Sequence, residues 1–303
     1  MLSESARWVG QSRHYDRYYF NGLLNDDCRY AAHYNGMQFE AFPEVAWLQA
    51  EATAAAQRLF DAPYIEYRAL SGVHCTLAMI AALTEPGDGV WSLSPACGGH
   101  FATAALVERL GRRSGFITLT DDGEIDLAAL ASMLRQPPAA VVLDHGLTCH
   151  GFAVAPLRQW LDRHGLTEVL ILYDASHPLG LIAGGALANP LDDGADILQG
   201  NTHKSFPGPH RAIIATRNAS LAARIQGGWM PVWCLRPTYL VCYSYSLPCG
   251  KWRVLAPTMR GRCVAMPGYW GSGWRICRDG PYCRRRPICY CYRGAERSGG
   301  CRP

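Results

Sequence analysis

Two polar segments of this sequence decide the fold: residues 173–184 read YDASHPLGLIAG, and residues 200–209 read GNTHKSFPGP. Short runs typical of buried strands precede them, at 169–173 and 196–199. Asp174 therefore ends one predicted strand, and Lys204 follows the next. Open parallel sheets bind ligands at the carboxyl ends of their strands, so the sequence places reactive side chains where such a sheet would use them.

The pattern around these segments is an alternation of strands and helices. Strands are predicted at 64–70, 90–93, 116–119, 140–143, 169–173, 196–199 and 212–215, and helices at 44–60, 73–83, 101–110 and 156–164. Alternation of this kind favours an α/β fold with a mostly parallel central sheet and helices on both faces.

The composition indicates a globular protein without a membrane anchor. The chain has 303 residues, of which 49% are hydrophobic, enough to bury a sizeable core. No uncharged apolar run reaches the length of about 18 residues expected of a transmembrane helix. The first residues, MLSESAR, lack the order of a secretory signal. We therefore expect a soluble, cytoplasmic protein.

Charge divides the chain near Gln226. The net charge is +4, but thirteen basic and only two acidic residues follow Gln226, together with nine of the 13 cysteines, five of the nine tryptophans and no histidine. The part up to Gln226 is acidic on balance. We therefore predict an N-terminal arm at 1–24, a large domain at 25–226 and a distinct tail at 227–303 that is irregular or disordered.

Three interpretations of the tail stay open. Its Cys, Trp, Gly, Pro and Arg content is what a shifted reading frame of a GC-rich gene would give, and we favour a frame change near residues 220–230. A zinc-binding appendage is the second, although Cys289 and Cys291 do not form a paired C-x-x-C site and the tail has no histidine. Its cations and tryptophans could also bind nucleic acid, which we consider the weakest reading. We expect no metal site.

A third segment, PACGGH at 95–100, completes the set. Together the three segments resemble the serine hydroxymethyltransferase family, pyridoxal 5'-phosphate (PLP) enzymes with the fold of aspartate aminotransferase. The resemblance rests on the order Asp-x-x-His-x-x-Gly-Leu-Ile-Ala followed by Thr-His-Lys-x-x-x-Gly-Pro, and it covers about residues 30–225.

The resemblance implies four catalytic residues. Lys204 would form the Schiff base with PLP, and Asp174 would pair with the pyridine nitrogen, because a carboxylate there keeps that nitrogen protonated. His100 would stack on the ring, and His177 would lie close to the cofactor.

Further contacts to the cofactor follow from the same resemblance. Those expected to bind PLP are Ser71, Gly72, Val73, Thr148, Thr202 and His203, with the first three at a helix N-terminus that favours phosphate. Tyr34 would serve a neighbouring subunit's site. Plain structural roles stay open: Ser71 and Gly72 could form a simple helix cap, Asp174 could cap the turn after its strand, and His100 and His177 could be structural histidines.

The implied reaction is cleavage or formation of the Cα–Cβ bond of a serine- or threonine-like β-hydroxy amino acid, through a glycine quinonoid. The acceptor stays open. PACGGH departs from the family's Leu-Ala-His-Gly-Gly-His, which helps to seat tetrahydrofolate, so a threonine aldolase or transaldolase that uses an aldehyde is an alternative. A third alternative is an inactive remnant with a basic Cys-rich binding tail. The family builds its sites between two subunits, so a homodimer is expected.

Overall fold

The computed structural model describes residues 31–34, 37–40, 43–146, 148 and 152–229, with Arg7, Gln11 and two short strands near the C-terminus. Side chains are described for 50–131, 134–146, 148 and 152–227, besides Arg7 and Gln11. Most of the predicted arm and most of the predicted tail lie outside these residues. No helix in the described part of the chain has the length and apolar character needed to span a membrane.

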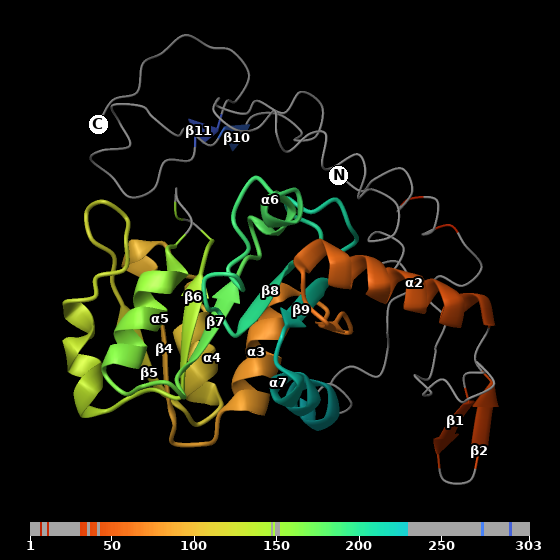
Figure 1. Cartoon of the computed structure of the whole chain (residues 1–303), viewed down its shortest axis with the longest axis horizontal. Helices are drawn as coiled ribbons and strands as arrows, with labels where there is room; N and C mark the ends of the chain where they lie inside the picture. The colour runs from red at the N-terminus through yellow and green to blue at the C-terminus, as the bar shows by residue number, and fades with distance from the viewer. Residues whose placement is uncertain are drawn as a thin grey trace.

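The central sheet has seven strands in the order β3-β9-β8-β7-β6-β4-β5 (Figure 1). Their bounds are β3 Tyr64–Glu66, β4 Gly89–Leu93, β5 Arg113–Ile117, β6 Ala140–Asp144, β7 Leu170–Asp174, β8 Ile197–Asn201 and β9 Ala212–Thr216. The run from β5 to β8 is parallel throughout, and β9 is antiparallel to both of its neighbours. The prediction of a mostly parallel sheet is confirmed.

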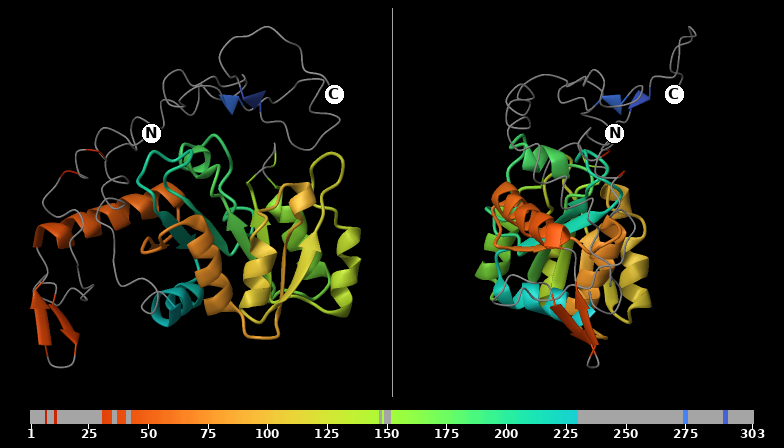
Figure 2. Two further views of the ribbon diagram at one scale, coloured as in Figure 1. Left: turned by 180° about the vertical axis from the view of Figure 1, so that it is seen from behind. Right: turned by 90° about the vertical axis from the view of Figure 1, so that its right-hand side faces the viewer.

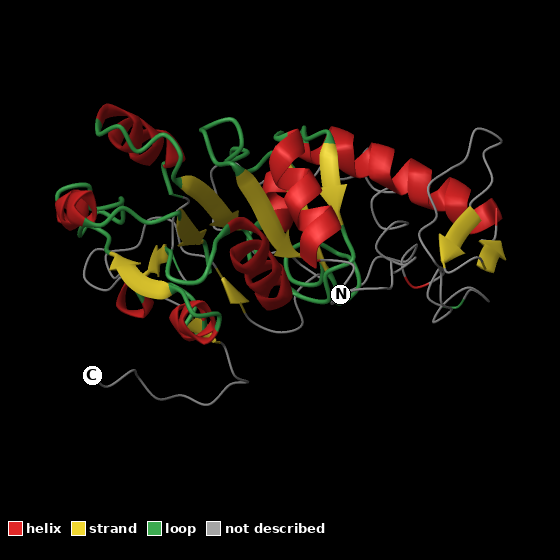
Figure 3. Cartoon of the chain, turned by 90° about the horizontal axis from the view of Figure 1, so that it is seen from below, coloured by secondary structure: helices red, strands yellow, loops and turns green. Residues whose placement is uncertain are grey.

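Helices cover both faces of this sheet, as predicted (Figures 2 and 3). One face packs against α3, α4 and α7, and the other against α2, α5 and α6. The helix bounds are α2 Pro43–Phe60, α3 Gly72–Leu83, α4 Thr103–Arg109, α5 Val154–Arg163, α6 Leu179–Ala183 and α7 Ala219–Arg224, with short helical turns η1 Pro95–Cys97, η2 Ala129–Arg135 and η3 Ile225–Trp229.

Alternating side chains of the central strands enter two separate hydrophobic cores. In β6, Ala140 and Val142 belong to the core under α3, while Val141 and Leu143 belong to the core under α5. All four are fully buried, which explains why the strand is a continuous apolar run. Burial of each Val or Leu side chain contributes about 1.5–3 kcal/mol to folding. The sheet is therefore a rigid support for the polar residues at its strand ends.

Two strand predictions need correction. β5 begins at Arg113, three residues before the predicted strand at 116–119, because the turn at Gly111, with a φ of 75°, delivers the chain directly into the strand. β5 is an edge strand whose Phe116 is half exposed, so its sequence lacks the apolar run that marks the central strands. β3 ends at Glu66 rather than at 70, since the chain leaves the sheet there to reach α3.

Two small antiparallel strand pairs complete the described part of the chain. β1 (Ala31–Tyr34) pairs antiparallel with β2 (Met37–Glu40), and β10 (Trp274–Arg275) pairs with β11 (Cys291–Tyr292). The β1–β2 hairpin lies beside the N-terminal end of α2, apart from the seven-stranded sheet (Figures 1 and 3).

Candidate active site

Three neighbouring strands end in polar residues at one edge of the sheet. Asp144 ends β6, Asp174 ends β7 and Asn201 ends β8. Asp144 and Asp174 are register partners, so the two carboxyl groups belong to adjacent positions of one edge. Above them lies a cleft, partly open to solvent, which is lined by Val73, Thr76, His100, Thr103, Leu106, Asp144, Asp174, Ser176, His177, Asn201 and Lys204.

Lys204 enters this cleft from the loop that follows β8. Its Nζ lies 3.0 Å from Nε2 of His177. Partial burial lowers the pKa of Lys204, and the carboxyl groups of Asp174 and Asp144 oppose that shift. Lys204 is one of only two lysines in the sequence, the other being Lys251. A lysine with a lowered pKa is a better nucleophile toward an aldehyde than an ordinary surface lysine.

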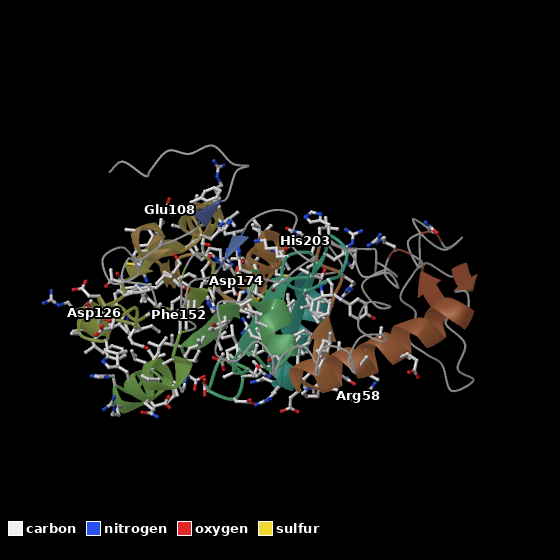
Figure 4. The ribbon with its side chains drawn as sticks, turned by 90° about the horizontal axis from the view of Figure 1, so that it is seen from above. Arg58, Glu108, Asp126, Phe152, Asp174 and His203 are labelled. Atoms are coloured by element: carbon white, nitrogen blue, oxygen red, sulfur yellow. The ribbon has the colours of Figure 1, made fainter. Side chains whose placement is uncertain are left out.

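Asp174 lies in the interior of the domain, at the end of β7 (Figure 4). It is only 7% exposed, and its Oδ1 accepts a hydrogen bond of 2.8 Å from the backbone N–H of Ser176. Burial raises the pKa of Asp174, while hydrogen bonding from Ser176 and the charge of Lys204 oppose the rise. A cationic ring nitrogen beside Asp174 would favour the ionised form, as opposite charges do in a buried site.

His177 connects the two predicted motifs. Its ring is exposed on one side, but desolvation within the cleft lowers the pKa of His177 to about 4, with help from the charges of Lys204 and His100. The ring is therefore neutral at physiological pH, and its Nε2 can accept a hydrogen bond from the Lys204 ammonium. The hydroxyl of Ser205 donates to the His177 carbonyl and accepts from the N–H of Gly180, 3.0 Å away, which ties the lysine loop to α6.

His100 reaches the cleft from the loop after η1. Its backbone N–H donates to Oδ2 of Asp144 at 2.8 Å. Its ring stacks on Phe101, with the ring centres 4.7 Å apart and the planes inclined by 22°. Burial lowers the pKa of His100, while the charge of Asp174 opposes that shift.

The N-terminus of α3 closes another side of the cleft. Ser71 caps the helix, since its Oγ accepts a hydrogen bond from the N–H of His74 at 3.2 Å. The N–H of Gly72 donates to Oδ1 of Asn201 at 2.8 Å. A Cβ at Gly72 would lie 2.2 Å from Oγ of Ser176, so this position has no room for a side chain. Ser71 therefore caps α3, and the first turns of the same helix border the cleft through Val73 and Thr76.

The remaining predicted residues are less directly placed. Thr202 is fully buried, and its Oγ1 donates to the Pro209 carbonyl at 2.6 Å, which holds the lysine loop in shape. The His203 ring packs edge-on against the ring of His210, with the ring centres 4.2 Å apart. Thr148 is half buried and is not among the described residues that line the cleft. The Tyr34 side chain lies outside the described residues. The predicted cofactor contacts, and the predicted role of Tyr34 in a partner's site, remain predictions.

Asp144 and Asn201 are two strand-end residues of the site that the sequence interpretation missed; it also missed Thr76, Thr103, Leu106 and Ser176. A signal was present for the two strand-end residues. Asp144 follows the predicted strand 140–143 directly, as Asp174 follows its own strand, and Asn201 comes three residues before Lys204. Sheet order was needed to see that these strands are neighbours.

Comparison with known proteins assigns the family. The family model "Serine hydroxymethyltransferase" matches residues 26–228. An L-threonine:uridine-5'-aldehyde transaldolase of an Amycolatopsis species is 36% identical over 228 residues, 74% of this chain and 53% of that protein. The serine hydroxymethyltransferase of Archaeoglobus fulgidus is 35% identical over 209 residues, 67% of this chain and 47% of that protein.

A solved structure has the same fold. The L-threonine transaldolase from Pseudomonas fluorescens, in its internal aldimine state, superposes with a TM-score of 0.73 at 23% identity, over 85% of this chain and 57% of that one. The chain thus spans about half the length of the relatives that it matches. The family model nonetheless covers the whole of the cleft described above, from Ser71 to Lys204, and on that match the chain belongs to the serine hydroxymethyltransferase family.

Proposed function

We propose that this protein binds PLP at Lys204 and breaks or forms the Cα–Cβ bond of β-hydroxy amino acids, as an aldolase or transaldolase. The observation that carries the proposal is the position of Nζ of Lys204. It lies 3.0 Å from Nε2 of His177 in the same cleft as the buried carboxyl group of Asp174. An amine and a buried carboxyl in one cleft suit the aldehyde and the ring nitrogen of PLP.

The described residues fit this cofactor. Lys204 would hold it covalently, Asp174 would face its ring nitrogen, and His100 would cover its ring. The phosphate would lie at the N-terminus of α3, where the helix dipole favours an anion and where Val73, in the first turn of the helix, lines the cleft. Bound PLP would supply an electron sink for the pair released when a bond to the substrate's α-carbon breaks.

The chain's own residues would manage the protons. Asp174 would keep a proton on the ring nitrogen, because the ionised carboxylate favours the cationic form of its neighbour. Neutral His177 would hold Nζ of Lys204 in place through their 3.0 Å contact. Nζ of Lys204 has a lowered pKa, so it can gain and lose a proton near neutral pH more readily than an ordinary lysine.

We propose an aldehyde, rather than a folate, as the acceptor. Relatives at 36% identity are named L-threonine:uridine-5'-aldehyde transaldolases, and this chain carries PACGGH at 95–100 instead of the folate-seating segment. A folate-dependent hydroxymethyltransferase is the second candidate, supported by the A. fulgidus relative.

The test is cleavage of L-threonine by the full-length protein loaded with PLP. We expect acetaldehyde release, followed by NADH oxidation with alcohol dehydrogenase, and a new β-hydroxy amino acid when uridine-5'-aldehyde is added. If only serine with tetrahydrofolate reacts, the aldehyde proposal is wrong. If PLP binds but neither pair reacts, the chain is the inactive remnant.

The tail gives a separate prediction. We propose that the reading frame changes near residues 220–230, because the charge and cysteine content change abruptly after Gln226. Translation of the other two frames of the coding DNA beyond codon 226 is then expected to yield the family's small domain. If both frames give only stop codons or unrelated sequence, the tail is a genuine appendage.

We also propose that the protein is a cytoplasmic homodimer in which Tyr34 serves the partner's site. Support comes from the β1–β2 hairpin, whose first strand ends at Tyr34 and which lies apart from the seven-stranded sheet (Figure 1). Cross-linking or light scattering of the purified protein measures the subunit number directly.

A further inference from the structure

Asp144 is a buried carboxyl group of the cleft to which the proposed chemistry gives no role. It is 3% exposed, ends β6, and is the register partner of Asp174. Buried carboxyl groups are costly to keep unless they are hydrogen-bonded or protonated. Its presence at this edge of the sheet therefore needs a specific reason.

The described hydrogen bond of Asp144 goes to the segment that carries His100. Oδ2 of Asp144 accepts the backbone N–H of His100 at 2.8 Å, across 44 residues of sequence. Position 100 lies just after the left-handed Gly98 and the closely packed Gly99. One carboxyl oxygen thus fixes the backbone of His100, which is one of the residues that line the cleft.

The surrounding backbone is shaped for this contact. A Cβ at Gly146 would lie 2.9 Å from Oδ1 of Asp144, so a glycine there leaves room for the carboxyl group. A Cβ at Gly99 would lie 2.0 Å from the carbonyl oxygen of Leu93, so the His100 segment is pressed against the end of β4. Both partners are therefore held at the distance that the hydrogen bond requires.

The electrostatic surroundings favour a neutral Asp144. Burial and the neighbouring Asp174 raise the pKa of Asp144 to about 8, while the His100 hydrogen bond and the charge of Lys204 oppose the rise. A protonated carboxyl still accepts a hydrogen bond through its carbonyl oxygen. A protonated Asp144 would add no second negative charge beside Asp174, whose own pKa burial also raises.

We infer that Asp144 is a positioning residue that fixes the backbone of His100 and thereby the height of the His100 ring over the cofactor. The part that concerns the cofactor rests on the proposed function. The hydrogen bond itself does not, because it is made within the chain.

The test compares Asp144→Asn with Asp144→Ala in the full-length protein. Asparagine keeps an acceptor oxygen and mimics the neutral carboxyl, whereas alanine removes the acceptor. The first measurement is hydrogen exchange of the His100 amide without PLP, resolved by NMR. In Asp144→Ala we expect exchange about tenfold faster, the size expected for loss of one buried hydrogen bond, and in Asp144→Asn a rate within about threefold of wild type.

The second measurement is the PLP dissociation constant and the induced circular dichroism of the bound cofactor. We expect Asp144→Ala to weaken binding by about tenfold and to alter the dichroism, and Asp144→Asn to restore both. Asp126→Ala is the control, because Asp126 also accepts backbone N–H bonds, from Ala128 and Ala129, but outside the cleft. It should change neither measurement.

The outcomes separate the two proposals. Unchanged His100 exchange in Asp144→Ala overturns the positioning role whether or not PLP binds. If Asp144→Ala and Asp144→Asn lose PLP binding to the same extent, the charge of Asp144 matters and its hydrogen-bond acceptor does not. That result would also overturn the positioning role. If wild type shows no PLP binding but His100 exchange responds as expected, the proposed function fails while the contact stands.

Discussion

Replacing Lys204 by alanine is expected to lower kcat/KM for L-threonine cleavage by about 10⁴-fold at saturating PLP, the upper range for losing a positioned proton-transfer group. Lys204 is the only lysine among the described residues, since the other lysine of the sequence is Lys251. No other described amine can take over its role. The measurement is steady-state acetaldehyde release by purified wild type and variant.

Lys251→Ala is the matched control, because it removes the other lysine of the chain. It should keep the wild-type rate. Equal loss in both variants, or none in Lys204→Ala, would contradict the assignment of Lys204. Thermal unfolding of each variant separates loss of chemistry from loss of fold.

Asp174→Asn is expected to lower kcat/KM by about 10²–10³-fold, the usual effect of removing one buried electrostatic partner of the reacting groups. Asparagine preserves the shape and can still accept the Ser176 N–H, whose bond to Oδ1 is 2.8 Å long. It cannot hold a positive charge on the ring nitrogen. The loss should therefore appear in kcat at saturating substrate, with a smaller change in the affinity for PLP.

The control for Asp174 is Asp196→Asn. Asp196 also accepts a backbone N–H, that of Ile171 at 2.7 Å, and burial likewise raises its pKa, but it lies at the opposite end of the sheet, before β8. A rate close to that of wild type is expected, because Asp196 lies at the end of the sheet away from the cleft. A normal rate in Asp174→Asn would rule out the role given to that carboxyl group.

The central strands were predictable because both faces of the sheet are buried. β6 extends one residue beyond the predicted strand 140–143, and β7 is shifted by one residue from the predicted strand 169–173. The edge strand β5 was placed three residues late, since an edge strand half open to water needs no continuous apolar run. The local hydrophobic pattern of the sequence thus located the buried central strands more accurately than the half-exposed edge strand.

The candidate site was predictable only where a motif marked it. Asp174, His177 and Lys204 were identified from two short segments, and they share one cleft. Asp144 was missed because a lone acid after a strand is common, and its meaning comes from sheet order and from the 2.8 Å bond to the His100 N–H. Contacts across 44 residues of sequence depend on tertiary packing, which no local pattern contains.

The central claim is that PLP is held covalently by Lys204. The most direct measurement is to incubate the full-length protein with PLP, reduce it with borohydride, digest it and locate the added mass by peptide sequencing in a mass spectrometer. We predict that the modified peptide contains Lys204 and disappears in Lys204→Ala. A reduced adduct found only on Lys251 or the N-terminal amine, or none at all in the wild type, would contradict the claim.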